Sequence, residues 1–152
     1  MLFAIAAAAV IAVSLTALPA AAAASGPLPV AGLSSPVGAG AFAGWASAPG
    51  VKAVSGDFNG DGRQDIALTG GDGWWTVPVA FSNGNGTFTV TNSPVPNIPV
   101  WAQDPTAKVV AGDVNHDGRA DLMLTGGDGW WTVPVAFSNG NGTFSVTNAP
   151  IA

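Results

Sequence analysis

Two short loops rich in side-chain oxygens carry the clearest chemistry in this chain of 152 residues. They run from Asp57 to Asp65 and from Asp113 to Asp121, and both follow the pattern D-x-N-x-D-G-x-x-D. Positions 1, 3, 5 and 9 therefore offer oxygen ligands, and the glycine at position 6 permits a sharp turn. Hard oxygen ligands that close around one point suit Ca²⁺, which takes about six to eight of them in a flexible geometry.

Each loop can also contribute one backbone oxygen. Position 7, held by Arg63 and Arg119, can offer its carbonyl group, while we expect the arginine side chains to be solvated. Mg²⁺ suits this ligand set less well, because it keeps water ligands and demands a strict octahedron. The predicted Ca²⁺ ligands are Asp57, Asn59, Asp61, Arg63 and Asp65 in the first loop, and Asp113, Asn115, Asp117, Arg119 and Asp121 in the second.

Two other interpretations fit the loops less well. Asp, Asn and Gly also form turns without any metal, but two complete matches at the same place in a repeat favour metal binding. A helix-flanked EF-hand would need a bidentate Glu at position 12, where this chain has Leu68 and Leu124. The loops are therefore predicted to lie between strands.

A long internal repeat contains these loops. The 21 residues from Leu68 to Phe88 recur without change from Leu124 to Phe144. Asp57 likewise recurs as Asp113, 56 residues later. A fixed long period predicts one supersecondary unit stacked on its neighbour.

Four short strands are predicted in each unit. In the first they cover about residues 51–56, 65–69, 75–82 and 87–91, separated by Gly- and Asn-rich turns. Pro78 lacks a backbone donor, so we expect a bulge or an unpaired position in the third strand. The pattern predicts an all-β fold with two four-stranded antiparallel propeller blades.

Two blades do not close a propeller, which usually needs about four to eight. The exposed faces and edges are therefore expected to meet further blades, from a longer chain or from other copies in a homo-oligomer. A fragment of a larger β-propeller is the simpler expectation.

The strings Gly56-Asp57-Phe58-Asn59-Gly60-Asp61-Gly62 and Phe81-Ser82-Asn83-Gly84-Asn85-Gly86-Thr87-Phe88 resemble FG-GAP or VCBS-type repeats. That family occurs in integrin alpha-subunit heads, secreted bacterial proteins and fungal lectins. The resemblance covers residues 42 to 150 and implies a β-propeller with Ca²⁺ between the first two strands of each blade. His116, where the first loop has Gly60, departs from the pattern.

The Gly-Gly-Asp-Gly-Trp-Trp stretches are the second candidate site. A Trp beside a glycine turn can stack on a sugar ring while a nearby Asp accepts hydroxyl hydrogen bonds, which suits the lectin-like resemblance. The alternative, that all four Trp side chains are core between blades, is favoured. The candidate ligand-binding residues are Asp72, Trp74, Asp128 and Trp130.

The chain is predicted to be exported. Residues 1–24 are apolar and end in small residues, as in a secretory signal peptide. An uncleaved membrane anchor is the less favoured alternative, and no Lys or Arg precedes the apolar stretch. Residues 25–41 form a Gly/Pro/Ala-rich leader, and the two repeats span 42–97 and 98–152. No membrane span is expected after cleavage, and a secreted, extracellular location follows.

The charge and residue types exclude several functions. With nine acidic and four basic residues, the chain lacks the basic face that nucleic acids require. His116 is the single histidine and has no counterpart in the first repeat, so we expect no enzyme. A binding module for a glycan or an extracellular protein is the main hypothesis. A calcium-rigidified scaffold, or an accessory domain of a larger secreted protein, is the alternative.

Overall fold

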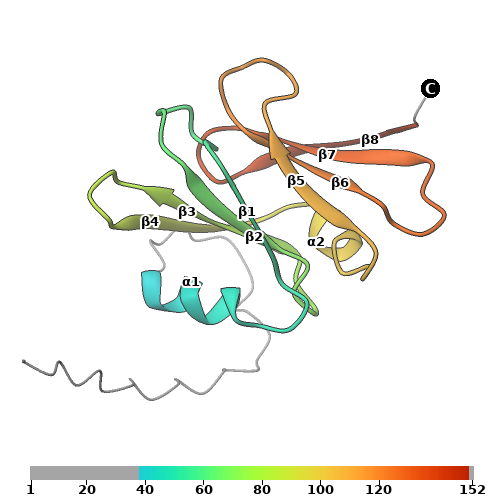
Figure 1. Ribbon diagram of the computed structural model, residues 1–152, viewed down its shortest axis with the longest axis horizontal. Coiled ribbons are helices and arrows are strands. Elements are labelled where there is room, and N and C mark those ends of the chain that lie inside the picture. Colours follow the sequence, from blue (N-terminus) through green and yellow to red (C-terminus); the bar gives the residue numbers. More distant parts are fainter. Residues whose placement is uncertain (1–37, 151–152) are drawn as a thin grey trace, which may run out of the picture.

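The computed structural model describes residues 38–150, arranged as two four-stranded antiparallel sheets and two short helices (Figure 1). The predicted signal peptide and residues 25–37 of the leader lie outside the described residues. The first sheet contains β1 (Lys52–Gly56), β2 (Asp65–Thr69), β3 (Thr76–Ser82) and β4 (Phe88–Pro94). The second contains β5 (Lys108–Gly112), β6 (Asp121–Thr125), β7 (Thr132–Ser138) and β8 (Phe144–Pro150).

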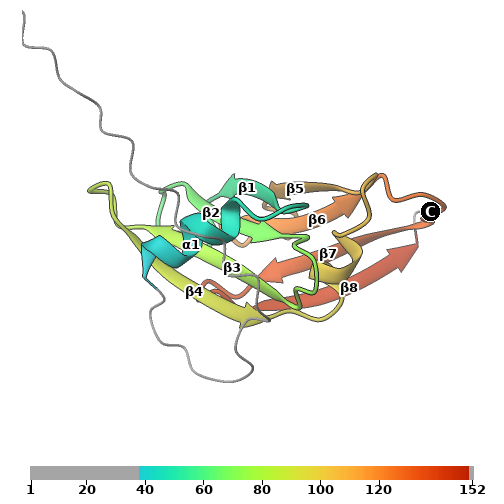
Figure 2. The same ribbon diagram turned by 90° about the horizontal axis from the view of Figure 1, so that it is seen from below.

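Both sheets follow chain order, β1-β2-β3-β4 and β5-β6-β7-β8. Viewed as in Figure 2, each sheet runs from β1 or β5 at one side to β4 or β8 at the other. The two first strands, β1 and β5, contact each other across the gap between the sheets. The predicted fold class is confirmed: the chain forms two propeller-like blades, and the sheets do not close into a ring.

Pro78 has the effect that the sequence predicts. Strand β3 pairs with β4 in an unbroken register that includes Pro78 opposite Asn92. Its pairing with β2 is limited to Ile66 with Ala80 and Ala67 with Val79, and ends before Pro78 is reached. The missing backbone N–H therefore leaves an unpaired position on the β2 side, without a bulge.

Two helices were not predicted. Helix α1 (Ala39–Ala46) precedes the first sheet and α2 (Ile98–Trp101) precedes the second. They are repeat equivalents, because Phe42 corresponds to Ile98 and Trp45 to Trp101. Within residues 38–150, no helix is long and apolar enough to cross a lipid bilayer.

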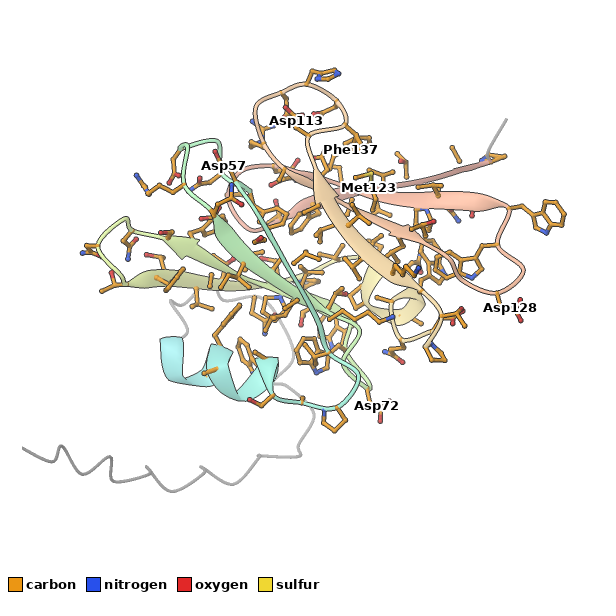
Figure 3. All side chains as sticks on the ribbon, in the orientation of Figure 1. Asp57, Asp72, Asp113, Met123, Asp128 and Phe137 are labelled. Atoms are coloured by element: carbon orange, nitrogen blue, oxygen red, sulfur yellow. The ribbon has the colours of Figure 1, made fainter. Side chains whose placement is uncertain are left out.

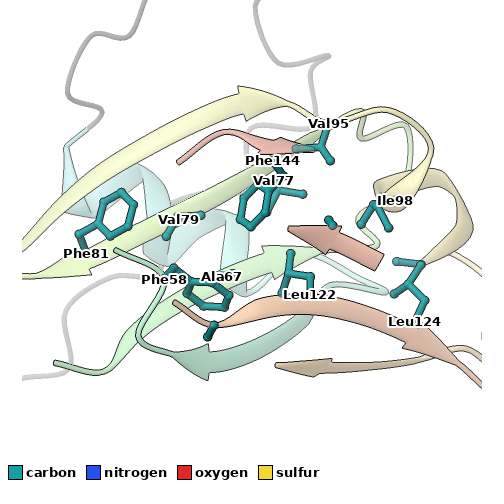
Figure 4. Close-up of a cluster of buried hydrophobic side chains, with 13 residues drawn as sticks. Phe58, Ala67, Val77, Val79, Phe81, Val95, Ile98, Leu122, Leu124 and Phe144 are labelled. Carbon is teal, nitrogen blue, oxygen red and sulfur yellow. The ribbon is translucent and has the colours of Figure 1, made fainter. Parts of the chain in front are cut away.

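One face of the first sheet packs against the opposite face of the second sheet. We call the first of these the front face and the second the back face, and we use the same names for the equivalent faces of both sheets. The front face of the first sheet is apolar and lies against the back face of the second (Figure 4). Helix α2 covers part of the same back face. The front face of the first sheet comprises Val54, Phe58, Ala67, Val77, Val79 and Phe81, and the back face of the second comprises Leu122, Leu124, Ala136, Phe144 and Val146.

The back face of the first sheet is covered by α1 instead of another sheet. A separate apolar cluster joins Phe42 of this helix to the sheet, and Trp45 packs against it. The back-face residues of the first sheet are Ile66, Leu68, Ala80, Phe88 and Val90.

Candidate metal-binding loops

The two carboxylate loops connect the first two strands of each sheet, as predicted. Figure 3 shows Asp57 and Asp113 at one end of the blades and Asp72 and Asp128 at the turns that follow β2 and β6. Because adjacent strands run antiparallel, the loop after a first strand and the turn after a second strand must lie at opposite ends of a sheet. The candidate metal site and the candidate ligand site are therefore separate.

Asp57 organises the first loop around its carboxylate. Its Oδ1 accepts hydrogen bonds from the N–H of Gly60 at 2.7 Å and of Asp61 at 3.1 Å, and its Oδ2 accepts one from Gly62 at 2.7 Å. Asn59 Oδ1 accepts a further bond from Asp61 N–H at 3.1 Å. Gly60 and Gly62 have φ values of 79° and 82°, which favour glycine. The loop is thus curled around its first carboxylate.

Asp65 lies beneath the loop and is fully buried. Its Oδ2 accepts from Phe58 N–H and its Oδ1 from Ser82 N–H, both at 2.9 Å. Burial raises the pKa of the Asp65 carboxyl, and repulsion from Asp61 and Asp57 adds to the rise, while the two hydrogen bonds oppose it. Asp65 therefore ties the loop to the end of β3 and experiences the charge of both other carboxylates.

Arg63 is exposed, as expected, and its guanidinium group also makes two contacts within the protein. Its Nε donates to the carbonyl oxygen of Ser82 at 2.8 Å, and its Nη2 lies 2.5 Å from Asp61 Oδ2. Desolvation opposes the shift, but hydrogen bonds from Asn59 and from Arg63 N–H, with the Arg63 charge, lower the pKa of Asp61. The sequence could not reveal this contact, because the arginine bridges two loops that are separate in the chain.

The second loop reproduces these contacts with one difference. Asp113 Oδ2 accepts from Gly118 at 3.0 Å, and Arg119 donates to the Ser138 carbonyl at 2.9 Å and pairs with Asp117 at 2.6 Å. His116 takes φ 60°, close to the 79° of Gly60. Among the described contacts, only the first loop has a bond from this position to its first Asp.

The structure brings the predicted ligands into the same loops without forming a compact metal cluster. In residues 38–150, no three His, Cys, Asp or Glu side chains are gathered around one point. Asp61 and Asp117 instead pair with arginines, and Asp65 and Asp121 accept backbone hydrogen bonds. The donor set fits a hard cation in its chemistry, because every predicted ligand atom is a carboxylate, amide or carbonyl oxygen.

The tryptophans of the second candidate site have different surroundings. Trp74 is buried in the cluster beneath α1, so it is a core residue, although it does not lie between the blades as expected. Trp130 is half-buried against the core between the sheets. Trp131 is 84% exposed and is not part of any core. Asp72 and Asp128 are exposed in their turns.

A pocket of about 330 Å³ lies beside Trp131. It opens between α2 and the outer end of β7 and β8, and three indole rings contribute to its wall. The sequence suggested Trp130 as a ligand contact but missed Trp131 and Trp101, because identical dipeptides give no sign of which copy is covered. The lining residues are Trp101, Gly129, Trp130, Trp131, Thr132, Pro134 and Asn148.

Comparisons with known proteins give one family match. Residues 57–124 match the family described as the FG-GAP-like repeat. No curated protein matches this sequence.

One similar solved structure is an Agrocybe aegerita lectin that recognises non-reducing terminal N-acetylglucosamine. The two are 24% identical, with a TM-score of 0.47 over 66% of this chain, which spans 24% of the lectin's length. The matched segment starts at Asp57, includes both carboxylate loops and ends in β6, so the similarity to the FG-GAP-like repeat spans parts of both units.

Proposed function

We propose that this chain is an extracellular β-propeller-type binding module whose two carboxylate loops each hold one Ca²⁺ ion. The observation that carries the proposal is that both loops curl around their first Asp in the same way. Gly62 and Gly118 donate to Asp57 and Asp113 at 2.7 and 3.0 Å. The extracellular location rests on the predicted signal peptide.

Unbalanced negative charge supports a cation in the first loop. Asp57, Asp61 and Asp65 lie within nine residues, and Asp65 is buried and repelled by the other two. Arg63 neutralises Asp61 but makes no ion pair with Asp57 or Asp65. A divalent ion bound by the side chains and the position-7 carbonyl would offset this repulsion and stabilise the loop.

Thermal unfolding with and without calcium tests the metal. We expect the melting temperature to rise in excess CaCl₂ relative to EGTA, and calorimetric titration to give about two ions per chain with Kd near 10⁻⁴ to 10⁻³ M. The variant Asp57→Ala/Asp113→Ala should lose both effects. The matched control, Asp72→Ala/Asp128→Ala, removes two exposed aspartates outside the loops and should keep them. Identical melting in calcium and EGTA would sink the metal assignment.

A glycan is the second part of the proposed function, and the pocket beside Trp131 supports it. An exposed indole next to two others offers apolar surface for the faces of a sugar ring. Thr132 and Asn148 add a hydroxyl and an amide that can bond to sugar hydroxyls. The competing role, a calcium-rigidified scaffold, requires no such pocket.

A glycan array with two matched variants separates these roles. If the pocket binds sugar, Trp131→Ala should lose the array signal while its melting temperature stays within a few degrees of the parent. Trp75→Ala changes the same residue of the other repeat and should retain binding. A parent protein that binds no glycan would favour the scaffold, and equal losses in both variants would contradict this pocket.

A further inference from the structure

The two repeats form a natural comparison, because identical side chains have different exposure. Val77 is fully buried, whereas its equivalent Val133 is half-exposed. Trp75 is 39% exposed and Trp131 is 84% exposed. The sequence around each pair is the same from Leu68 to Phe88 and from Leu124 to Phe144. The difference in solvent exposure therefore depends only on whether another sheet packs against the front face.

The front face of the second sheet is the uncovered equivalent of a face that is buried in the first. Phe58 is 0% exposed, whereas Val114, which occupies the same position, is 43% exposed. Thr147, which pairs with Val135, adds a polar side chain to this face, and Met123 and Phe137 are labelled in Figure 3. The apolar members are Val110, Val114, Met123, Val133, Val135 and Phe137.

The back face of the first sheet is the matching surface. Phe144 on the buried back face of the second sheet is 7% exposed, whereas its equivalent Phe88 is 38% exposed. A shallow pocket of about 100 Å³ lies there, between Phe42 of α1 and Phe88. The chain thus displays both halves of its own internal interface, one at each end.

Helix α1 covers part of this surface, because Leu68, Ala80 and Val90 are buried beneath it, but Phe88 stays 38% exposed. Helix α2, on the second sheet, contacts β7, and the first sheet still packs beside it. Gly142 at the internal interface has the side chain of Thr91 against it, so an added Cβ would lie 2.1 Å from Thr91 Oγ1. Its equivalent Gly86 has no neighbouring atom within 4 Å of such a Cβ and leaves room for Thr147, the equivalent of Thr91.

The groups that make polar contacts at the internal interface have repeat equivalents at the two outer faces. Lys52 Nζ donates to the carbonyl oxygens of Asp104 and Ala107, at 2.8 and 2.5 Å. Those two residues form a turn closed by Ala107 N–H to the Asp104 oxygen at 3.1 Å. The equivalent turn is closed by Val51 N–H to the Ala48 oxygen at 3.3 Å and offers the equivalent carbonyl oxygens, although Gly50 within it has φ 76°.

We propose that the chain associates head to tail with a second copy, front face of the second sheet against back face of the first. Val114 of one copy then packs against Phe88 of the next, and Lys108 donates to the turn from Ala48 to Val51. The contact is heterologous, so repetition closes a ring if the rotation allows and otherwise extends a filament. Propellers of four, six or eight blades would need two, three or four copies.

Several positions differ between the two interfaces, among them Met123 in place of Ala67 and Gln64 in place of Ala120. Ala120 packs so close to Gly56 that a Cβ there would lie 2.6 Å from the alanine methyl. At the proposed contact Gln64 takes the place of Ala120 and faces Gly112. The longer side chain fits this close approach less well, so Gln64→Ala should tighten the association.

Solution mass by light scattering tests the proposal on the full chain. The parent should give a mass at least twice the 14.9 kDa of one chain. Val110→Glu on the front face and Phe88→Glu on the back face should each be monomeric. Mixing them should give a one-to-one dimer and nothing larger, because only one intact interface remains. The matched control Val100→Glu changes an exposed valine on α2, outside both faces, and should assemble like the parent.

A milder variant tests association without introducing a charge into an apolar face. Lys108→Met leaves both apolar faces unchanged. It should weaken association several-fold and should unfold cooperatively. A parent that stays monomeric up to about 1 mM would overturn the proposal and indicate that another kind of partner covers these faces. Mixed variants that fail to associate although each melts cooperatively would overturn it as well.

Discussion

Phe58, in the loop after β1, packs edge-on against Phe144 of β8, with ring centroids 6.2 Å apart and an interplanar angle of 75°. The two rings belong to different blades and are 0% and 7% exposed. The first carboxylate loop is therefore anchored in the core between the sheets. Loop conformation and blade packing are coupled through this pair.

The coupling can be measured with a double-mutant cycle. Phe58→Ala and Phe144→Ala should each lower the free energy of unfolding by about 3–5 kcal/mol. Their combined effect should be smaller than the sum by about 0.5–1.5 kcal/mol, because each variant removes the same aromatic contact. Urea denaturation gives the three values. Strict additivity would show that the rings do not interact energetically.

Asp65 should stabilise the fold even without calcium. Asp65→Ala leaves the N–H groups of Phe58 and Ser82 without their acceptor, at a cost of about 1–3 kcal/mol for each buried group. Urea denaturation in EGTA measures the loss. Asp61→Ala is the matched control, since its carboxylate is at the surface, and it should unfold in EGTA almost as the parent does. Equal losses in the two variants would contradict this role.

Removing the loop arginines should strengthen calcium binding if the proposed function holds. Arg63 and Arg119 compete with the ion for Asp61 and Asp117. Arg63→Ala/Arg119→Ala keeps the position-7 carbonyl groups and removes only the competing charge. An exposed ion pair contributes little, so the Kd should fall by no more than about fivefold in calorimetric titration. Weaker binding in the variant would mean that the arginines help to shape the site.

His116→Gly should stabilise the second loop. His116 has φ 60°, in the left-handed region that costs an L-residue about 1–2 kcal/mol. Part of that gain is offset by the greater freedom of glycine in the unfolded chain, so we expect a net gain of about 0.5–1 kcal/mol. Thermal and urea unfolding measure it. The reverse change, Gly60→His in the first loop, should destabilise by a similar amount.

Lys52 should make stability rise at high pH. Burial lowers the pKa of its ammonium group below the ordinary 10.5, and the charge of Asp104 opposes this only in part. Between the folded pKa and 10.5 the unfolded chain binds a proton that the folded chain has lost, so the free energy of unfolding rises with pH. Urea denaturation up to about pH 10.5 should show that rise in the parent relative to Lys52→Met. Parallel pH curves would refute it.

The strands could be predicted from the sequence because their signals are local. The carboxylate loop before β2 and the Gly-rich turn after it predict a strand over Asp65–Thr69, which is the range observed. The effect of Pro78 followed from its missing donor. The oxygen pattern likewise located both loops between strands.

The helices and the loop arginines could not be predicted, because they depend on contacts distant in sequence. Helix α1 lies in a Gly- and Ala-rich stretch with no side-chain cap, and Phe42 attaches it to the first sheet. Helix α2 is a four-residue element with Pro99 in its first turn. The different solvent exposure of Trp75 and Trp131 could not be predicted for the same reason, because only the neighbouring blade distinguishes the two residues.

Front-to-back packing also makes the fold tolerant of changes in length. Every blade presents one kind of face forward and the other kind backward, so a whole 56-residue unit could be inserted or deleted between Asp57 and Asp113 without a mismatched junction. The identical stretch from Leu68 to Phe88 supplies strands that fit at either position. We therefore expect duplication or loss of complete units to be a low-barrier route by which such chains change size.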